Sequence, residues 1–301
     1  MPAKQITRRH LVSAGLTGSF LLNGCSRFGK RVDENAVRNA EALPVDDLLI
    51  TRDLAYAPGD RHTLDVYTPR TAGKARPVVV FIYGGTWISG AKAEYTWVGI
   101  ALARQGYVAV VADYRIYPNG AWPGFIEDNA AAVRWARDHA AELGGDPAKL
   151  VLLGHSAGAF NAASLAIDHR WLAAKGMDPK RDLKAMIGLA GPYEFVPDTP
   201  ELRTMFGPKS QWSDIYPITH VDGQSPPILL ITGGKDRAVG TVESERLAER
   251  LREKGAPVKR LHYPALDHNE TVFALAPPKG ETSQVMTDTT HFISASLPSD
   301  A

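Results

Sequence analysis

The stretch KLVLLGHSAG, residues 149–158, decides the fold. It opens with an apolar run typical of a buried strand, and the small residues at 157–166 favour a helix directly after it. Ser156 lies between the two, with Gly154 and Gly158 two positions before and after it. This spacing is typical of a sharp strand-to-helix turn that holds a reactive serine, where larger neighbours would clash. The alternative is a glycine-rich turn without a chemical role.

Short apolar runs alternate with helical patterns on both sides of this stretch. The turn residues 58–60 separate 48–56 from 63–68 and predict two antiparallel strands. Continuous apolar runs at 77–83 and 107–113 suit central parallel strands covered on both faces. The remaining elements are expected as strands at 183–189, 227–232 and 258–263, and as helices at 123–143 and 241–254, the latter with Val242, Leu247 and Leu251 on its apolar side. The pattern predicts one α/β domain over residues 45–298, with a doubly wound, mostly parallel sheet of about eight strands.

A serine hydroxyl is a weak nucleophile at neutral pH and needs a base beside it. His268 follows the strand expected at 258–263, and Asp236 follows the strand expected at 227–232. Both residues should therefore lie at the same edge of the sheet as Ser156. We expect Asp236 to orient the imidazole of His268, and the imidazole to take the serine proton.

Other polar residues compete for these roles. Asp236 could instead cap the helix expected at 241–254 or be an ordinary turn acid, and His268 could be an ordinary loop histidine. Asp267 is the alternative acid, but it adjoins His268 and is poorly placed to face its ring nitrogen. His155 lies inside the serine turn, and its side chain is expected to point away from the base.

The sequence YGGTW, residues 83–87, follows the third expected strand. Two glycines after a strand allow backbone amides to approach a ligand closely, and such a loop can stabilise an oxyanion together with the amide after the nucleophile. The expected donors are the amides of Gly85, Thr86 and Ala157. A plain strand-to-helix turn is the alternative.

Four stretches together resemble the esterase/lipase branch of the α/β-hydrolases, which includes hormone-sensitive-lipase-like carboxylesterases, kynurenine formamidases and feruloyl-esterase-like members. These stretches are LDVY (64–67), YGGTW (83–87), DYRIYP (113–118) and GHSAG (154–158). The resemblance runs from about residue 48 to the C-terminus. It implies an α/β-hydrolase fold, no cofactor, and hydrolysis of a small-molecule carboxylic ester through an acyl-enzyme intermediate.

The resemblance also implies the triad Ser156, Asp236 and His268. The family usually carries a histidine where this chain has Tyr83, so the way in which the following loop is braced is open. Two other functions are possible for a chain with these residues. An amidase, such as an arylformamidase, would use the same residues, and a catalytically inactive binding protein would normally lack one of the three.

Residues 193–225 lie between the sixth and seventh expected strands, where cap elements are usual. The large apolar residues of this segment are Phe195, Met205, Phe206, Trp212, Ile215 and Tyr216. They either line a substrate pocket or form local core. Because the segment is short, we expect acetyl to butyryl esters to be cleaved faster than long-chain esters.

Composition excludes several other classes of protein. The formal net charge is +1 and no basic patch is visible, so a nucleic-acid partner is not expected. Cys25 is the single cysteine, which rules out an internal disulfide. The histidines without an assigned role are His62, His139, His169, His220, His262 and His291. They show no paired metal-ligand spacing, so no metal site is expected.

Residues 1–25 read as an export signal. Arg8 and Arg9 precede an apolar run at 11–22, which is shorter than the roughly 20 residues that span a bilayer. The arginine pair resembles a twin-arginine signal, and LNGC at 22–25 resembles a bacterial lipobox. We expect a protein exported to the bacterial periplasm or anchored to a membrane by lipid on Cys25, with residues 26–44 as a linker. The alternative is an unstructured N-terminus.

Overall fold

The computed structural model describes residues 45–71, 75–276 and 282–298. The signal and linker expected over residues 1–44, with Cys25, lie outside the described residues. The described chain contains one eight-stranded sheet with the strand order β1-β2-β4-β3-β5-β6-β7-β8. This is the mostly parallel α/β architecture that the sequence predicts.

The strands agree closely with the apolar runs of the sequence. They are β1 (Leu48–Ala55), β2 (Thr63–Pro69), β3 (Arg76–Ile82), β4 (Val108–Ala112), β5 (Gly145–His155), β6 (Leu183–Leu189), β7 (Ile228–Gly233) and β8 (Val258–Tyr263). β2 pairs antiparallel with β1 and β4, and every other pair of neighbouring strands in the sheet is parallel. Parallel strands need long crossover connections, and helices supply most of these connections.

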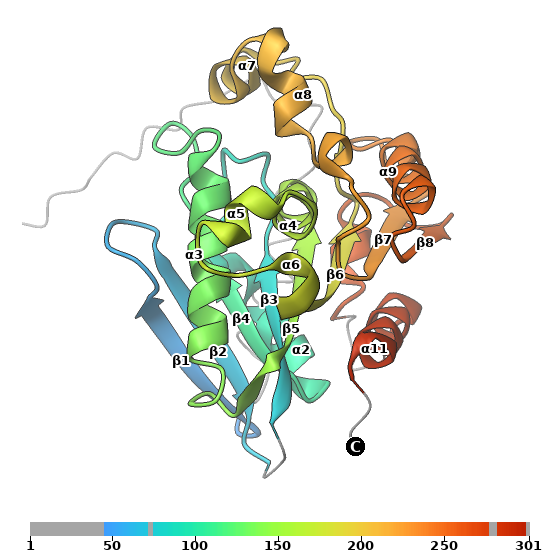
Figure 1. Cartoon of the computed structure of the whole chain (residues 1–301). Coiled ribbons are helices and arrows are strands. Elements are labelled where there is room, and N and C mark those ends of the chain that lie inside the picture. Colours follow the sequence, from blue (N-terminus) through green and yellow to red (C-terminus); the bar gives the residue numbers. More distant parts are fainter. Residues whose placement is uncertain (1–44, 72–74, 277–281, 299–301) are drawn as a thin grey trace, which may run out of the picture.

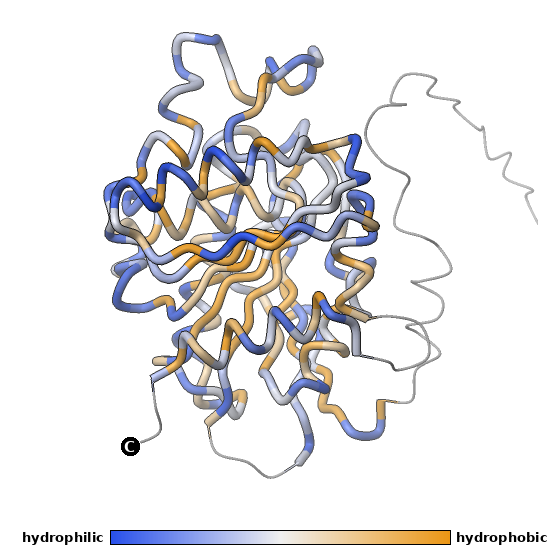
Figure 2. Tube along the Cα trace, turned by 90° about the vertical axis from the view of Figure 1, so that its right-hand side faces the viewer, coloured by the Kyte–Doolittle hydropathy of each residue, from blue (hydrophilic) through white to orange (hydrophobic). Residues whose placement is uncertain are grey.

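Helices enclose the sheet on both faces, and Figure 2 shows the apolar strands lying between them. They are η1 (Lys92–Tyr95), α2 (Thr96–Arg104), α3 (Gly124–Asp138), α4 (Ala157–Ile167), α5 (His169–Ala173), α6 (Pro179–Asp182), α7 (Pro200–Phe206), η2 (Lys209–Gln211), α8 (Trp212–Ile215), η3 (Pro217–His220), α9 (Thr241–Glu253), α10 (Glu270–Phe273) and α11 (Gln284–Ser296). No helix in the described part of the chain combines the length and apolarity that a membrane span requires.

Two details differ from the sequence prediction. The helix expected at 123–143 ends at Asp138, and β5 begins at Gly145 because that residue pairs with Arg76 before a bulge. In α9, Leu247 and Leu251 are fully buried, but Val242 is 45% exposed. Val242 lies in the first turn, where the apolar stripe of the helix has not yet reached the sheet.

The topology places the loops that matter at one edge of the sheet. The chain leaves β3 at residue 83, β5 at Ser156, β7 before Asp236 and β8 before His268. In a parallel sheet these carboxyl ends lie side by side. The segment 193–225 follows β6 and carries α7 and α8, which project beyond the sheet at the top of Figure 1.

Candidate active site

Ser156 occupies the strained turn that the sequence predicts. Its backbone has φ 54° and ψ −123°, and its amide donates to the carbonyl of Leu189 on the neighbouring strand at 2.9 Å. A Cβ on Gly158 would lie 2.0 Å from the carbonyl oxygen of Ile82, and a Cβ on Gly154 would lie 2.3 Å from the carbonyl oxygen of Gly158. Only glycine fits at these two positions, so α4 can begin tightly against the end of β3.

The structure brings Ser156, His268 and Asp236 into one hydrogen-bonded chain. The serine Oγ donates to His268 Nε2 at 2.8 Å, and His268 Nδ1 donates to Asp236 Oδ2 at 2.8 Å. The other carboxylate oxygen of Asp236 accepts from the amides of Ala238 and Val239, both at 2.8 Å. The Asp236 side chain is only 1% exposed, so these bonds fix the carboxylate in one orientation.

Asp267 does not contact the imidazole. Its carboxylate is exposed and accepts from the amide of Glu270 at 2.9 Å, at the start of α10. Of the two acids that the sequence offered, the geometry places Asp236, and not Asp267, at the ring nitrogen of His268.

The place of His155 in the turn predicted that its side chain points away from the base, and this prediction is wrong. Its ring lies 5.0 Å from that of His268, and its Nε2 donates to the backbone carbonyl of His268 at 3.0 Å. Its Nδ1 is buried without a hydrogen-bond partner among the described residues. Burial lowers the pKa of His155 to about 3, and the neighbouring His268 adds to this effect. His155 is therefore a neutral donor that holds the base loop, a contact that only the folded chain creates.

The loop after β3 presents backbone amides beside the serine. Thr86 and Trp87 have positive φ values of 56° and 57°, and Gly85 has φ 119°. A Cβ on Gly85 would lie 2.2 Å from the carbonyl oxygen of Ser89, so this turn requires glycine. Neither Thr86 nor Ala157 has a backbone acceptor for its amide among the described residues, which leaves both donors available to a ligand.

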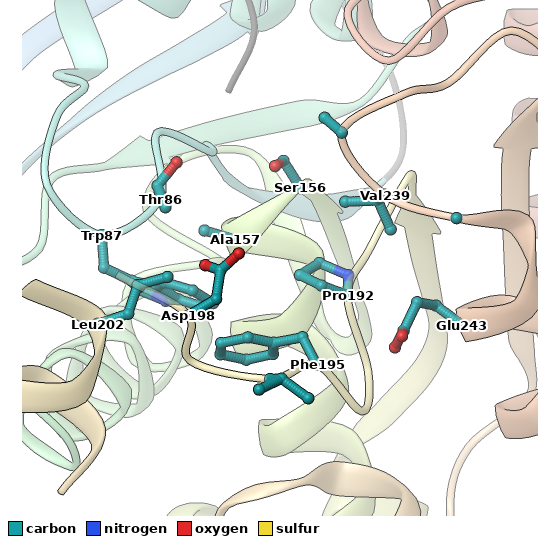
Figure 3. A pocket seen from close by; sticks show the side chains of 13 residues that line it. Thr86, Trp87, Ser156, Ala157, Pro192, Phe195, Asp198, Leu202, Val239 and Glu243 are labelled. Carbon is teal, nitrogen blue, oxygen red and sulfur yellow. The ribbon is translucent and has the colours of Figure 1, made fainter. Parts of the chain in front are cut away.

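A pocket of about 180 Å³ opens beside Ser156. Its lining residues are Thr86, Trp87, Ser156, Ala157, Pro192, Phe195, Val196, Asp198, Leu202, Ala238, Val239, Gly240 and Glu243. They come from the loops after β3, β5, β6 and β7, from the first turn of α9, and from the segment 193–225. The wall is mainly apolar, and Figure 3 shows the carboxylate of Asp198 pointing toward Ala157.

The large apolar residues of the segment 193–225 divide between the two expected roles. Phe195 lines the pocket, whereas Met205, Phe206 and Ile215 are each 2% exposed and form local core. The ring of Phe206 packs edge-on against Trp87 at 4.8 Å. The segment is thus anchored on the loop after β3.

Sequence reasoning assigned no role to three contributors to the site, although it did place Trp87 within the YGGTW motif. Trp87 is buried, and its indole donates to Asn161 Oδ1 at 2.8 Å, which ties the loop after β3 to α4. Asp198 and Glu243 line the pocket but belong to no sequence motif, because only the tertiary fold brings them there. Burial raises the pKa of Glu243, although the amides of Glu194 and Tyr193 oppose this shift.

No group of metal-ligating side chains is arranged to hold an ion within residues 45–71, 75–276 and 282–298. The site instead offers a hydroxyl, an imidazole, a carboxylate and free amides. This set of groups can transfer an acyl group without a cofactor.

Comparison with known proteins places the chain in a family. The BD-FAE family model matches residues 64–251, which is more than half of the chain. A probable isoprenylcysteine alpha-carbonyl methylesterase of Arabidopsis thaliana is 28% identical over 79% of this chain and 55% of that protein. Esterase LipC of Mycobacterium tuberculosis is 29% identical over 67% of this chain and 55% of that protein. The chain thus spans little more than half the length of these curated relatives.

Among solved structures, a truncated carbohydrate esterase from gut microbiota superposes with a TM-score of 0.72 at 23% identity. The match covers 84% of this chain and 98% of that chain. At this low sequence identity, the structural match supports the fold and not a particular activity. The chain has the α/β-hydrolase fold and belongs to the BD-FAE family.

Proposed function

We propose that this protein is a serine carboxylesterase in which Ser156, His268 and Asp236 form the catalytic triad. The observation that carries the proposal is the continuous hydrogen-bonded chain from the serine hydroxyl to a buried carboxylate. A binding protein built on this fold would not need that arrangement. The names of the relatives, which include esterases and methylesterases, agree with ester hydrolysis.

The geometry suggests a two-step reaction. His268 Nε2 accepts the serine proton as Oγ attacks the ester carbonyl, and Asp236 stabilises the imidazolium that forms. The amides of Gly85, Thr86 and Ala157 would donate to the developing oxyanion. The imidazolium then protonates the leaving alcohol, and a water molecule, activated by the same imidazole, releases the acid from the acyl-serine.

A fluorophosphonate probe tests this proposal directly, because it reacts with activated serines. We expect one label on the intact protein, mapped by peptide mass spectrometry to Ser156. Loss of labelling in His268→Ala would show that the imidazole activates this hydroxyl. A wild-type protein that stays unlabelled and hydrolyses no ester would contradict the proposal.

We also propose a preference for short acyl chains. The pocket volume of about 180 Å³ lies below the roughly 300–1,000 Å³ of pockets for drug-sized ligands. Trp87 lines this pocket and packs against the buried Phe206, so this part of the wall is supported from behind. A series of p-nitrophenyl esters should show the highest kcat/KM between acetyl and butyryl. A maximum at ten or more carbons would reverse this assignment.

Amide hydrolysis is the second candidate, because the same groups could cleave an amide. An arylformamidase activity would appear as hydrolysis of N-formylkynurenine at a rate comparable to that of a matched aryl ester. We favour the ester, since the sequence of residues 1–25 indicates export, which would separate the protein from intracellular tryptophan breakdown.

The site of action is also a proposal, and it rests on sequence alone. We infer export, cleavage before Cys25, and lipid on its sulfur. The wild-type protein should sediment with membranes, whereas Cys25→Ala should be released or accumulate as an uncleaved precursor. An intact cytosolic protein that retains Met1 or Pro2 would contradict export.

A further inference from the structure

The loop after β3 rests on a buried polar cluster that the proposed reaction does not use. At its centre is Tyr83, which is fully buried and lies between the rings of Tyr95 and Tyr114, with centroids 5.3 Å and 4.8 Å away. The Tyr83 hydroxyl donates to Asp113 Oδ1 at 2.7 Å and accepts from Arg61 at 2.7 Å. A phenol placed between a carboxylate and a guanidinium has both of its hydrogen-bonding functions satisfied.

The same two partners hold the far end of the loop. The Arg61 guanidinium also donates to the carbonyl of Gly90 at 2.7 Å, and Asp113 Oδ1 also accepts from the amide of Lys92 at 2.7 Å. A Cβ on Gly90 would lie 2.8 Å from the Tyr83 ring, so the far end of the loop packs directly on that ring. The loop is therefore fixed at residue 83, where it begins, and at residues 90–92, where it ends.

The segment between these anchors carries the strained residues. Thr86 and Trp87 both adopt positive φ, a conformation that non-glycine residues keep only where the surroundings enforce it. Thr86 lines the pocket beside Ser156, so the direction of its amide depends on this enforced geometry.

We propose that Tyr83 is a positioning residue that, through Arg61 and Asp113, aims the amides of residues 85 and 86 at the substrate carbonyl oxygen. In this chain the tyrosine takes the place of the histidine that resembling proteins carry before the glycine pair. Burial, with smaller contributions from Tyr114 and Asp113, raises the pKa of Tyr83 well above its usual value. The hydroxyl thus keeps its proton and remains a donor throughout the working pH range.

The test compares Tyr83→Phe with Tyr67→Phe. Tyr67 is equally buried, and its hydroxyl bonds Thr96 Oγ1 at 3.3 Å, away from the loop. Tyr83→Phe should lower kcat for a short ester by ~10- to 100-fold with little change in KM, as expected when groups that act in the transition state are misplaced. Binding of a trifluoromethyl ketone, which forms an oxyanion on the serine, should weaken by a similar factor.

Hydrogen exchange supplies a readout that does not depend on ester chemistry. In Tyr83→Phe, the amides of residues 84–91 should exchange at least about 10-fold faster than in the wild type, while Tyr67→Phe leaves them unchanged. Should Tyr83→Phe fold poorly, Arg61→Met tests the same contacts from a partly exposed side chain and should show the same kcat loss and the same faster exchange.

The inference rests on the proposed function only for the kinetic part. A wild type that hydrolyses no ester would refute the esterase proposal, and hydrogen exchange would still decide the role of Tyr83. Unchanged exchange in residues 84–91 of both loop variants would overturn the inference, as would a rise in KM at constant kcat. Losses for Tyr83→Phe and Arg61→Met that simply multiply in the double variant would also overturn it, because partners in one cluster should be non-additive.

Discussion

The site has two sides that are built on different principles. The catalytic wall consists of Ser156, which lines the pocket, with His268 and Asp236 behind it, and the cap wall is the part of the segment 193–225 that lines the pocket. On the catalytic wall, each polar group contacts the next at 2.8 Å, and the Asp236 side chain is 1% exposed. On the cap wall, Phe195 and Leu202 offer apolar contact, Val196 is 67% exposed, and Asp198 lies open to solvent.

This difference implies a division of labour. Directed hydrogen bonds in a buried setting have one acceptable geometry, so changes on the catalytic wall should alter the rate by orders of magnitude. Apolar contacts and exposed charges tolerate adjustment, so changes on the cap wall should alter substrate preference by small factors. The following experiments test this contrast, from the largest expected effect to the smallest.

Ser156→Ala should give the largest effect. Removal of the nucleophile is expected to lower kcat by about 10⁴- to 10⁶-fold, because the members of such a unit act together. The thermal midpoint should change little, since among the described residues the hydroxyl makes a single hydrogen bond, to His268. The control is Ser213→Ala on the exposed surface of the cap segment, which should keep full activity. Retention of activity in Ser156→Ala would show that another residue is the nucleophile.

Asp236→Asn should lower kcat by ~10²- to 10⁴-fold, because an amide at this position no longer selects the imidazole tautomer that accepts the serine proton. Asp267→Asn changes an exposed acid beside His268 whose carboxylate accepts from the amide of Glu270, so kcat should stay within a few-fold of the wild-type value. The opposite pattern, with Asp267→Asn inactive, would mean that the acid is wrongly assigned.

His155→Gln tests the buried histidine behind the base through the pH dependence of stability. Its folded pKa of about 3 lies below the unfolded value, so between these values the unfolded chain binds one more proton than the native state. Acidification below pH ~6.5 should therefore destabilise the wild type through this residue by about 1.4 kcal/mol per pH unit.

Glutamine can still donate to the carbonyl of His268 but does not titrate. Urea unfolding at pH 5, 6 and 7 gives the free energy of unfolding as a function of pH. The slope of this free energy against pH should be smaller in His155→Gln than in the wild type, by the amount that about one proton contributes. The exposed His291 provides a control for the replacement itself, His291→Gln, which should keep the wild-type free energy of unfolding at pH 7. Equal slopes for the wild type and His155→Gln would contradict a buried neutral imidazole.

Asp198→Asn should have the smallest effect. The wild-type carboxylate lines the pocket and should disfavour esters whose acyl group is itself anionic, such as a succinate monoester, relative to a butyrate ester. The variant should improve this ratio by roughly 2- to 5-fold, the range that exposed charge pairs give. The difference should shrink at high salt. Asp222→Asn, an exposed acid outside the pocket lining, should leave the ratio unchanged.

The sequence by itself determined the elements and the order in which the reactive residues occur. Apolar runs ended by glycines located β5 and β7, and GHSAG placed Ser156 between a strand and a helix. Both are local signals, because hydrophobic periodicity and the steric demand for glycine act within a few residues. Asp236 and His268 could be assigned because parallel strands end at a common edge.

Only the tertiary structure decided how these residues are supported. Asp113 meets Tyr83 across 30 positions of sequence, and His155 meets His268 across 113. From the sequence, the way in which the loop after β3 is braced stayed open, and the predicted direction of the His155 side chain was wrong. Neither the contact of Tyr83 with Asp113 nor that of His155 with His268 follows from a local pattern. The physical reason is that most buried polar atoms find a hydrogen-bond partner in the packed core, and packing alone determines which atoms come within reach.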